Sequence, residues 1–183
     1  MSEISIQKPR NKDSFSLFRV LVGVFVGLVV LFYLFELFAP SPRREIACRI
    51  KCSVNLKSLG ITMQIYASDY NDKYPVADRW CDLLIRHSKA EEKMFICPYA
   101  ERGRCHYAIN PNCEPNSPED IVLLFETKGG WNQVGGLELL TTKNHKDKGC
   151  NILFNDRHVE FVKSERIAEL KWGTENKDSE SIE

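Results

Sequence analysis

The longest apolar stretch of the chain runs from Val20 to Ala39 and is interrupted by a single charge, Glu36. As a helix that rises about 1.5 Å per residue, it spans about 30 Å, which matches the hydrocarbon thickness of a bilayer. Glu36 lies one turn from the end of the stretch, so its carboxylate reaches the headgroup region. The pattern predicts a transmembrane anchor over residues 15–39, preceded by a short cytoplasmic tail over residues 1–14.

A cleaved secretory signal is the alternative interpretation of this stretch. Such a signal has an apolar core of about 7–15 residues that ends in small residues, and the segment Leu37–Pro42 matches that pattern poorly. We therefore expect a retained anchor that crosses the membrane once, with membrane lipid as a partner. Basic residues lie on both sides of the stretch, so charge alone leaves the orientation open.

A second helical pattern follows the anchor. Pro40-Ser41-Pro42 predicts a kink or linker over residues 40–45, because proline prevents simple continuation of a helix. The next segment, from Arg43 to Tyr70, contains no proline and is predicted to be helical. Its apolar residues recur at spacings of three and four, with a break near Val54–Leu56, and should face a core: Ile46, Ile50, Leu59, Met63, Tyr66 and Tyr70. A short further helix is predicted over Trp80–His87.

Strands are predicted in the second half of the chain. Residues 97–119 contain four prolines and are expected to form a loop. Ile121–Phe125 is a short apolar run typical of a buried strand, and glycines mark a long loop over residues 129–136. Two further apolar runs, Cys150–Phe154 and His158–Val162, flank Asn155-Asp156-Arg157 in the way that two strands flank the turn of a hairpin.

The order of these elements predicts an α+β fold. Ser164 is expected to cap a last helix over Glu165–Trp172, with Ile167 and Leu170 turned inward. A membrane helix, an amphipathic helix and a small antiparallel sheet then form one pilin-like α+β domain over residues 46–172. Residues 173–183 are polar and acidic, and we expect them to form a disordered tail.

Composition and charge narrow the classes of function. The 183 residues include 25 basic and 25 acidic side chains, which gives a formal net charge of zero. Since no basic patch with interleaved aromatics follows residue 51, we do not expect a nucleic-acid partner. The chain also lacks a Gly-x-Ser-x-Gly elbow, a phosphate-binding glycine loop and a His-Glu-x-x-His pair. We therefore expect a protein that is not an enzyme and has no cofactor.

Seven cysteines are many for a chain of this length and predict that some are bridged in an oxidising compartment. Cys48 and Cys52 lie four residues apart on a predicted helix, which is poor geometry for a mutual disulfide, so they should pack in the core or bridge elsewhere. The chain has no Cys-x-x-Cys pair, which favours a stapled loop over a zinc site. The candidates for bridging are Cys81, Cys97, Cys105, Cys113 and Cys150.

Two blocks of the sequence resemble bacterial type IV pilin-like proteins of the group with a C-terminal His-X9-Asp-Gly motif. The first block comprises Cys52–Gly60, Tyr66–Asp69 and Tyr74-Pro75, and the second comprises Asn144-His145 and Gly149–Phe161. Between them, Phe95–Pro98 and Tyr107–Asn110 are similar to the Cys-Pro and Tyr-x-x-Asn elements of these proteins. The positions that match the motif itself are Asn144, His145, Asn151, Phe154, Asp156 and His158.

The chain departs from this group at three positions. Ser14 stands where the prepilin signal has glycine, and Arg19 stands where it has glutamate, so we expect no processing by prepilin peptidase. Arg157 stands where the motif has glycine, and the spacing from His145 to Asp156 is one residue longer. Because a positive φ strains an arginine, the hairpin should use a different turn or place another residue at that position.

The resemblance implies a pseudopilin-like structural or accessory protein of a secretion or pilus-type system. It implies other pilin-like or secretion-system subunits as partners. It also implies that the domain lies on the extracytoplasmic side of the cytoplasmic membrane.

The alternative is an exported ligand- or metal-binding module tethered to the membrane. Nitrogen and oxygen ligands converge if the hairpin packs beside the Ile121–Phe125 strand, with His145, Asp156, His158 and Glu126 as the candidates. Asp156 is equally a favoured turn residue, and His145 can bond a loop carbonyl. Separately, Trp131, Asn132 and Gln133 lie in a glycine-framed loop that suits either contact with a partner or packing onto its own domain.

Overall fold

A computed structural model describes residues 12–38 and 42–173 of the chain. These residues belong to two compact units, Met1–Ser41 and Pro42–Glu183, which are treated separately. The predicted tail over residues 1–14 lies largely outside the described residues, as do residues 39–41 and nearly all of the predicted tail over 173–183.

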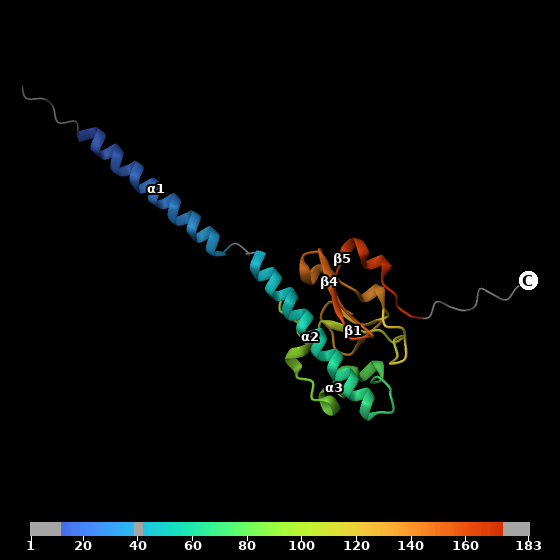
Figure 1. The fold of residues 1–183 in the computed structure, drawn as a ribbon. Helices are drawn as coiled ribbons and strands as arrows, with labels where there is room; N and C mark the ends of the chain where they lie inside the picture. Colours follow the sequence, from blue (N-terminus) through green and yellow to red (C-terminus); the bar gives the residue numbers. More distant parts are fainter. Residues whose placement is uncertain (1–11, 39–41, 174–183) are drawn as a thin grey trace, which may run out of the picture. The chain divides into compact units, whose positions relative to one another are not determined.

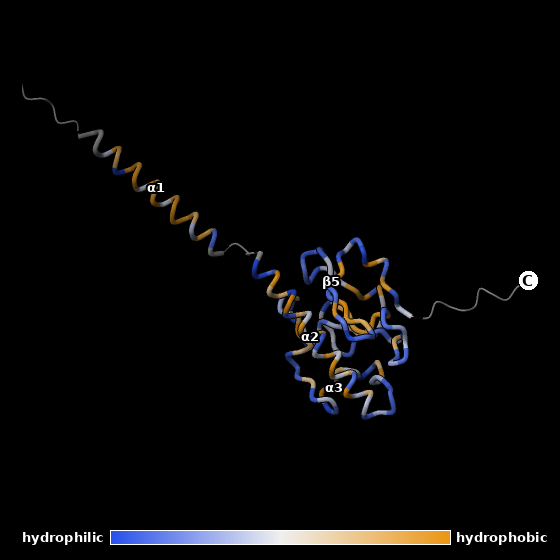
Figure 2. Tube along the Cα trace, viewed as in Figure 1, coloured by the Kyte–Doolittle hydropathy of each residue, from blue (hydrophilic) through white to orange (hydrophobic). Residues whose placement is uncertain are grey.

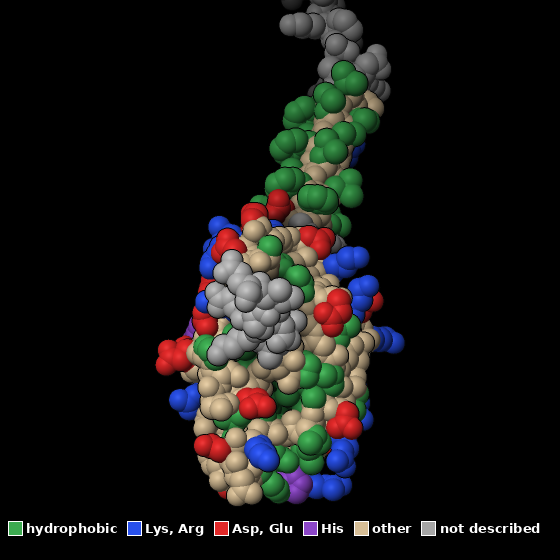
Figure 3. All heavy atoms as spheres, turned by 90° about the vertical axis from the view of Figure 1, so that its right-hand side faces the viewer, with side chains coloured by type: hydrophobic (Ala, Val, Ile, Leu, Met, Phe, Trp, Pro, Cys, Tyr) green, Lys and Arg blue, Asp and Glu red, His purple; other side chains and the backbone are tan. Residues whose placement is uncertain are grey.

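The first unit contains one helix, α1 (Lys12–Phe38), among its described residues. Its segment Ser16–Glu36 is long and apolar enough to cross a membrane, and none of that segment is buried. Figure 2 shows hydrophobic residues along most of this helix, and Figure 3 shows apolar side chains along the whole visible side of α1. The length and composition of α1 are therefore compatible with a membrane anchor or a signal sequence.

The second unit begins with α2 (Pro42–Asp69), an unbroken helix that lies against the sheet and α3 (Figure 1). The prediction of a linker over residues 40–45 is wrong from Pro42 onward. Proline is tolerated in the first turn of a helix because the N–H that it lacks has no partner there. Gly60, in the middle of α2, allows close approach to the sheet, since a Cβ at this position would lie 3.0 Å from Leu153.

The predicted core stripe of α2 is only partly correct. Leu59, Met63 and Tyr66 are buried as expected, but Ile46 and Ile50 are exposed, and Cys52 and Leu56 complete the buried face instead. Apolar residues occur on both sides of this helix, so periodicity alone does not select the side that packs. The break predicted near Val54–Leu56 separates Ile46 and Ile50, which lie on the exposed side of the helix, from the buried residues that follow.

The described residues form one five-stranded sheet with the strand order β3-β1-β2-β4-β5. Its strands are β1 (Tyr107–Ile109), β2 (Val122–Glu126), β3 (Gln133–Val134), β4 (Gly149–Phe154) and β5 (Val159–Lys163). All neighbours pair antiparallel except β1 and β3, which are parallel. The α+β prediction is therefore confirmed, but the sheet is mixed and not purely antiparallel.

Two of these strands lie in segments that the sequence predicts to be loops. β1 lies within residues 97–119, and β3 lies within residues 129–136. Both strands have only two or three residues, so neither is long enough to show an alternating pattern. Pairing with β2 makes β1 a strand, and pairing with β1 makes β3 a strand.

Both faces of the sheet are covered. α2 and α3 (Trp80–Ser88) bury one face in a core with Leu124 of β2 and Leu153 of β4. On the other face, Phe125 and Ile152 pack with Leu170 and Trp172 near the end of the described chain. Alternation along β4 therefore sends successive side chains into two different cores. In β2 the alternation is interrupted by a register shift between Val122 and Leu124, so Leu123 and Leu124 both enter the first core.

The last predicted helix is wrong in type and length. Residues Ser164–Glu169 form a 3-10 helix, and Leu170 is already extended. The hydroxyl of Ser164 donates to the carbonyl of Asp147 and does not cap the helix. Ile167 and Leu170 are half-buried against the second core, as predicted for their side chains.

The β4–β5 hairpin forms as predicted, and Arg157 itself takes the left-handed conformation, with φ of 71°. Neither Asn155 nor Asp156 takes the positive φ in its place. A non-glycine residue in this region costs about 1–2 kcal/mol. The backbone carbonyl of Arg157 accepts a 2.7 Å hydrogen bond from Lys57 of α2.

Replacing Arg157 with glycine is expected to stabilise the fold by about 0.5–1 kcal/mol, since relief of strain exceeds the added freedom of the unfolded chain. Urea unfolding of the detergent-solubilised chain measures this change. The bond from Lys57 survives because its acceptor is backbone. Arg157→Ala, which keeps a Cβ, is the control and should give no comparable gain; equal stabilisation by both variants would contradict the assignment of strain.

Candidate functional site

Polar side chains of two neighbouring strands meet in the core beneath α2. Glu126 at the end of β2 and Asn151 in β4 are 0 % and 1 % exposed. Both lie on the face that α2 covers, because they alternate with residues directed into the other core. The Asn151 amide donates to Oε1 of Glu126 over 2.9 Å. The sheet therefore places a carboxylate, which is costly to bury, at a defined point.

His145 supplies the principal partner of this carboxylate. It ends the 3-10 helix η4 (Lys143–His145), and its Nε2 lies 3.0 Å from Oε1 and 2.9 Å from Oε2 of Glu126. Asn144 beside it anchors the segment, since its amide donates to the carbonyl of Thr127 over 3.0 Å. Two buried atoms have no hydrogen bond of good geometry, Nδ1 of His145 and Oε2 of Glu126.

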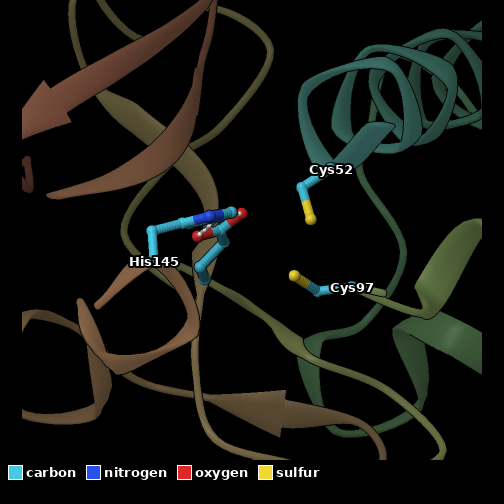
Figure 4. A group of neighbouring side chains, drawn as sticks. Cys52, Cys97 and His145 are labelled. Atoms are coloured by element: carbon cyan, nitrogen blue, oxygen red, sulfur yellow. Dashed lines mark hydrogen bonds and ion pairs between the residues drawn. The ribbon is translucent and has the colours of Figure 1, made fainter. Parts of the chain in front are cut away.

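Two cysteine thiols complete the cluster. Cys52 comes from α2, and Cys97 follows the 3-10 helix η2 (Glu92–Phe95); both are buried. Figure 4 shows the two sulfur atoms close together, with His145 on the opposite side of the space they share. One ligand atom from each of Cys52, Cys97, Glu126 and His145 lies within 4.8 Å of all the others. We call these four residues the core cluster.

The groups of the core cluster shift one another's protonation. A hydrogen bond with Cys52 lowers the pKa of Cys97 against the effect of burial, and His145 lowers it further. The same bond, with burial, raises the pKa of Cys52. Burial lowers the pKa of His145, but hydrogen bonds with Cys97 and Glu126 outweigh it and bring the pKa to about 9. Burial raises the pKa of Glu126. The cluster thus favours a thiolate beside a protonated imidazole.

A thiolate, an imidazole and a carboxylate have the chemistry of a nucleophilic centre, of a dithiol pair or of a metal site. Access decides among these roles. Cys97 is 1 % exposed, and the cavity that His145 lines holds about 20 Å³, room for about one water. A substrate has no path to the thiolate in this arrangement, whereas an ion or a proton needs no larger space.

Comparisons with known protein families, with curated proteins and with solved structures find no match for this chain. The core cluster and the surfaces of the domain therefore provide the argument about function. The resemblance of the two sequence blocks to pilin-like proteins stays a proposal.

The structure divides the four predicted metal ligands into two separate places. Glu126 and His145 lie together, but Asp156 and His158 belong to the β4–β5 turn, where the Asp156 carboxylate accepts from the His158 backbone over 2.9 Å. The two side chains also pair over 2.5 Å, and the His158 ring stacks on Phe154. β4 continues for three residues from Asn151 to Phe154 before the turn, a rise of about 10 Å. A single site with all four ligands is therefore wrong.

All seven cysteines are free thiols in the structure. Of the five bridging candidates, Cys81 and Cys105 lie side by side, with their sulfur atoms 4.0 Å apart. Cys97 adjoins Cys52, which was not among the candidates. Cys113 contacts the Asn155 side chain, and Cys150 packs in the second core.

The glycine-framed loop packs onto its own domain. The Trp131 indole donates to Asp82 of α3 over 3.0 Å, its ring packs on Phe95, and Arg104 lies over it. Asn132 accepts from the backbone of Cys81, and the carbonyl of Gln133 accepts from Trp80. These contacts favour the packing role over partner contact for Trp131.

One open cavity lies elsewhere, between residues 71–77 and 109–116, with a volume of about 540 Å³. Its size suits a small ligand. It is lined by the half-buried Tyr74 and the buried Cys113, and desolvation raises the pKa of each to about 12, so both stay neutral near pH 7. Most of the other lining residues come from loops. The core cluster therefore offers more side chains that can react or bind an ion near pH 7 than this cavity does.

Sequence reasoning missed Cys52 and Cys97 as neighbours of Glu126 and His145. Both cysteines stand in the segments that resemble pilin-like proteins, one in the first block and one in the Cys-Pro element. That placement could have singled out the two cysteines as a pair. It gives no sign that they lie beside His145, which follows Cys97 by 48 residues. The packing of α2 on the sheet brings them together.

Replacing Asn151 with leucine is expected to destabilise the domain by about 1–3 kcal/mol, because Glu126 loses its amide donor in a buried setting. Urea unfolding of the detergent-solubilised chain measures the loss. Asn116→Leu is the matched control, since Asn116 is exposed, and should change stability by less than about 0.5 kcal/mol. Equal effects of the two substitutions would contradict the importance of the polar network.

Proposed function

We propose that this chain is a membrane-anchored, pilin-like structural or accessory component of a secretion or pilus-type system. α1 is retained as a single-pass anchor in the cytoplasmic membrane, without cleavage by prepilin peptidase. The domain that begins with α2 lies on the extracytoplasmic side. The resemblance of residues 52–75 and 144–161 to pilin-like proteins supports this role, as does a fold with a long helix packed on a sheet.

The observation that carries the proposal is an apolar stripe on the solvent side of α2. We call it the outer stripe; its members are 44–55 % exposed and comprise Ile46, Ile50, Val54, Ile61 and Ile65. Their spacings of four and seven residues place them on one face of the helix. The opposite face of α2 already fills the core, so the helix is apolar on two sides.

A surface helix normally directs polar residues toward water, and a helix that is apolar on both sides is normally enclosed. The outer stripe begins eight residues after the end of α1, so it starts close to the membrane surface along the chain. Five exposed branched aliphatic residues in one row indicate a contact surface. An apolar helix of a neighbouring anchored subunit fits a surface of this shape and position.

The face of the domain in Figure 3 shows acidic and basic side chains interspersed, without a large area of one sign. This distribution agrees with the zero net charge. Apolar contact along α2 is therefore a better basis for association than electrostatic steering.

A second candidate function is an exported metal-binding module on the same anchor. The core cluster favours it, because sulfur, nitrogen and oxygen donors lie within 4.8 Å of one another. The two roles are compatible, since the outer stripe is about half exposed and the core cluster is buried beneath α2. Ile46 of the stripe also lines the small cavity beside His145.

Photo-crosslinking tests the outer stripe. A photoreactive amino acid at position 61 in native membranes should capture a protein subunit that has an N-terminal apolar helix of its own. The control is position 137, because Leu137 is 48 % exposed but belongs to the 3-10 helix Leu137–Leu139. Capture of the same protein from both positions, or of no protein from position 61, would contradict the proposal.

Charge on the stripe should break the same contact. Ile61→Asp with Ile65→Asp is expected to weaken co-purification of the captured subunit at least tenfold, since an unpaired carboxylate buried in an apolar contact costs more than about 1.4 kcal/mol. Leu137→Asp is the matched control and should leave co-purification unchanged. Both residues are exposed in the domain, so circular dichroism of the variants should match that of the unchanged protein.

A further inference from the structure

We propose that the core cluster is a structural zinc site in which Cys52, Cys97, Glu126 and His145 bind one Zn²⁺. The inference deepens the second candidate function, a metal-binding module at the same cluster, and does not depend on the pilin-like role. It rests on the donor atoms that meet in the core, on the two orphaned polar atoms among them and on the elements that supply them.

The donor set matches zinc chemistry. Zinc is bound by thiolate sulfur, imidazole nitrogen and carboxylate oxygen, almost always with four ligands when its role is structural. Tetrahedral coordination with bonds of about 2.0–2.3 Å places neighbouring ligand atoms about 3.3–3.8 Å apart. The four donors here lie within 4.8 Å of one another, so small side-chain rotations bring them to that spacing.

The polar atoms of the cluster are incompletely satisfied by the protein. Oε2 of Glu126 and Nδ1 of His145 are buried without a hydrogen bond of good geometry. Glu126 and His145 are 0 % and 1 % exposed, so bulk solvent does not reach them. When the ion binds, both cysteines and Glu126 are deprotonated, and the dication offsets two of their three negative charges. A bound zinc ion thus removes a cost that buried acceptors otherwise impose.

The surroundings support a closed, structural site. Asn151 donates to Oε1 of Glu126 and so orients the carboxylate, as residues behind metal ligands commonly do. The four ligands come from α2, the segment after η2, β2 and η4, so the ion would join the helix to the sheet and to both flanking segments. A cavity of about 20 Å³ lies beside His145 and is lined also by Ile46 and Arg49 of α2.

A disulfide between Cys52 and Cys97 is the competing state of the same residues. It would remove two ligands and leave Glu126 and His145 as they are. In an oxidising compartment free thiols persist when a metal protects them, so the two states make opposite predictions about thiol content.

The decisive experiment uses the full chain, extracted in detergent without chelators or reductant. Elemental analysis should find about one zinc per chain, and mass spectrometry of the unreduced protein should find Cys52 and Cys97 unbridged. Removal of the ion with a chelator should lower the melting temperature by roughly 5 °C or more. A Cys52–Cys97 disulfide, or zinc below a tenth of an equivalent, would overturn the proposal.

Two further measurements keep the test independent of variant folding. Cobalt added to the reduced, metal-free wild-type chain should give a thiolate-to-cobalt charge-transfer band that saturates at one equivalent; no band would overturn the site. Cys52→Ser should abolish that band and the bound zinc. Cys113→Ser, the same change at a buried cysteine outside the core cluster, should retain both. Loss of zinc in both variants would refute the assignment of Cys52.

Discussion

The burial of the Glu126 carboxylate is the constraint on which the domain is built. A carboxylate in a core is tolerated only where donors or cations meet it, because its desolvation costs several kcal/mol. The chain brings those partners from distant segments, Asn151 from β4 and His145 from η4. The thiols of Cys52 and Cys97 lie beside them. Each partner restrains the element that supplies it.

This polar centre explains why α2 has a defined position on the sheet. Apolar contacts of Leu56, Leu59 and Met63 supply burial, but such contacts tolerate some sliding of a helix. The thiol of Cys52 meets the cluster at one point, and Gly60 lets the helix approach Leu153 closely. Near its start, Glu45 pairs with Lys148 over 2.7 Å. Together these contacts hold α2 in register with β4.

The two sides of α2 have different roles. Its inner side belongs to the core and to the candidate zinc site, whereas its outer stripe is apolar and about half exposed. A helix held firmly on its inner side presents a rigid outer surface, which lowers the entropy cost of association. The proposed structural role and the proposed metal site thus meet in one helix: the ion holds the inner side, and the outer side is available to a neighbouring subunit.

The sequence by itself determined the elements with long local patterns: the apolar helix, the helix that became α2, the helix Trp80–Ser88 and the β4–β5 hairpin. Local periodicity and turn residues carry that information, even though Arg157 accepts a strained φ where glycine was expected. Only the tertiary structure decided the short strands β1 and β3, because two or three residues become a strand only when another strand pairs with them. It also decided which apolar side of α2 packs, and it replaced Asp156 and His158 by Cys52 and Cys97 beside Glu126 and His145. Donors from four separate segments meet only when the helix docks on the sheet, and no local pattern in the chain encodes that contact.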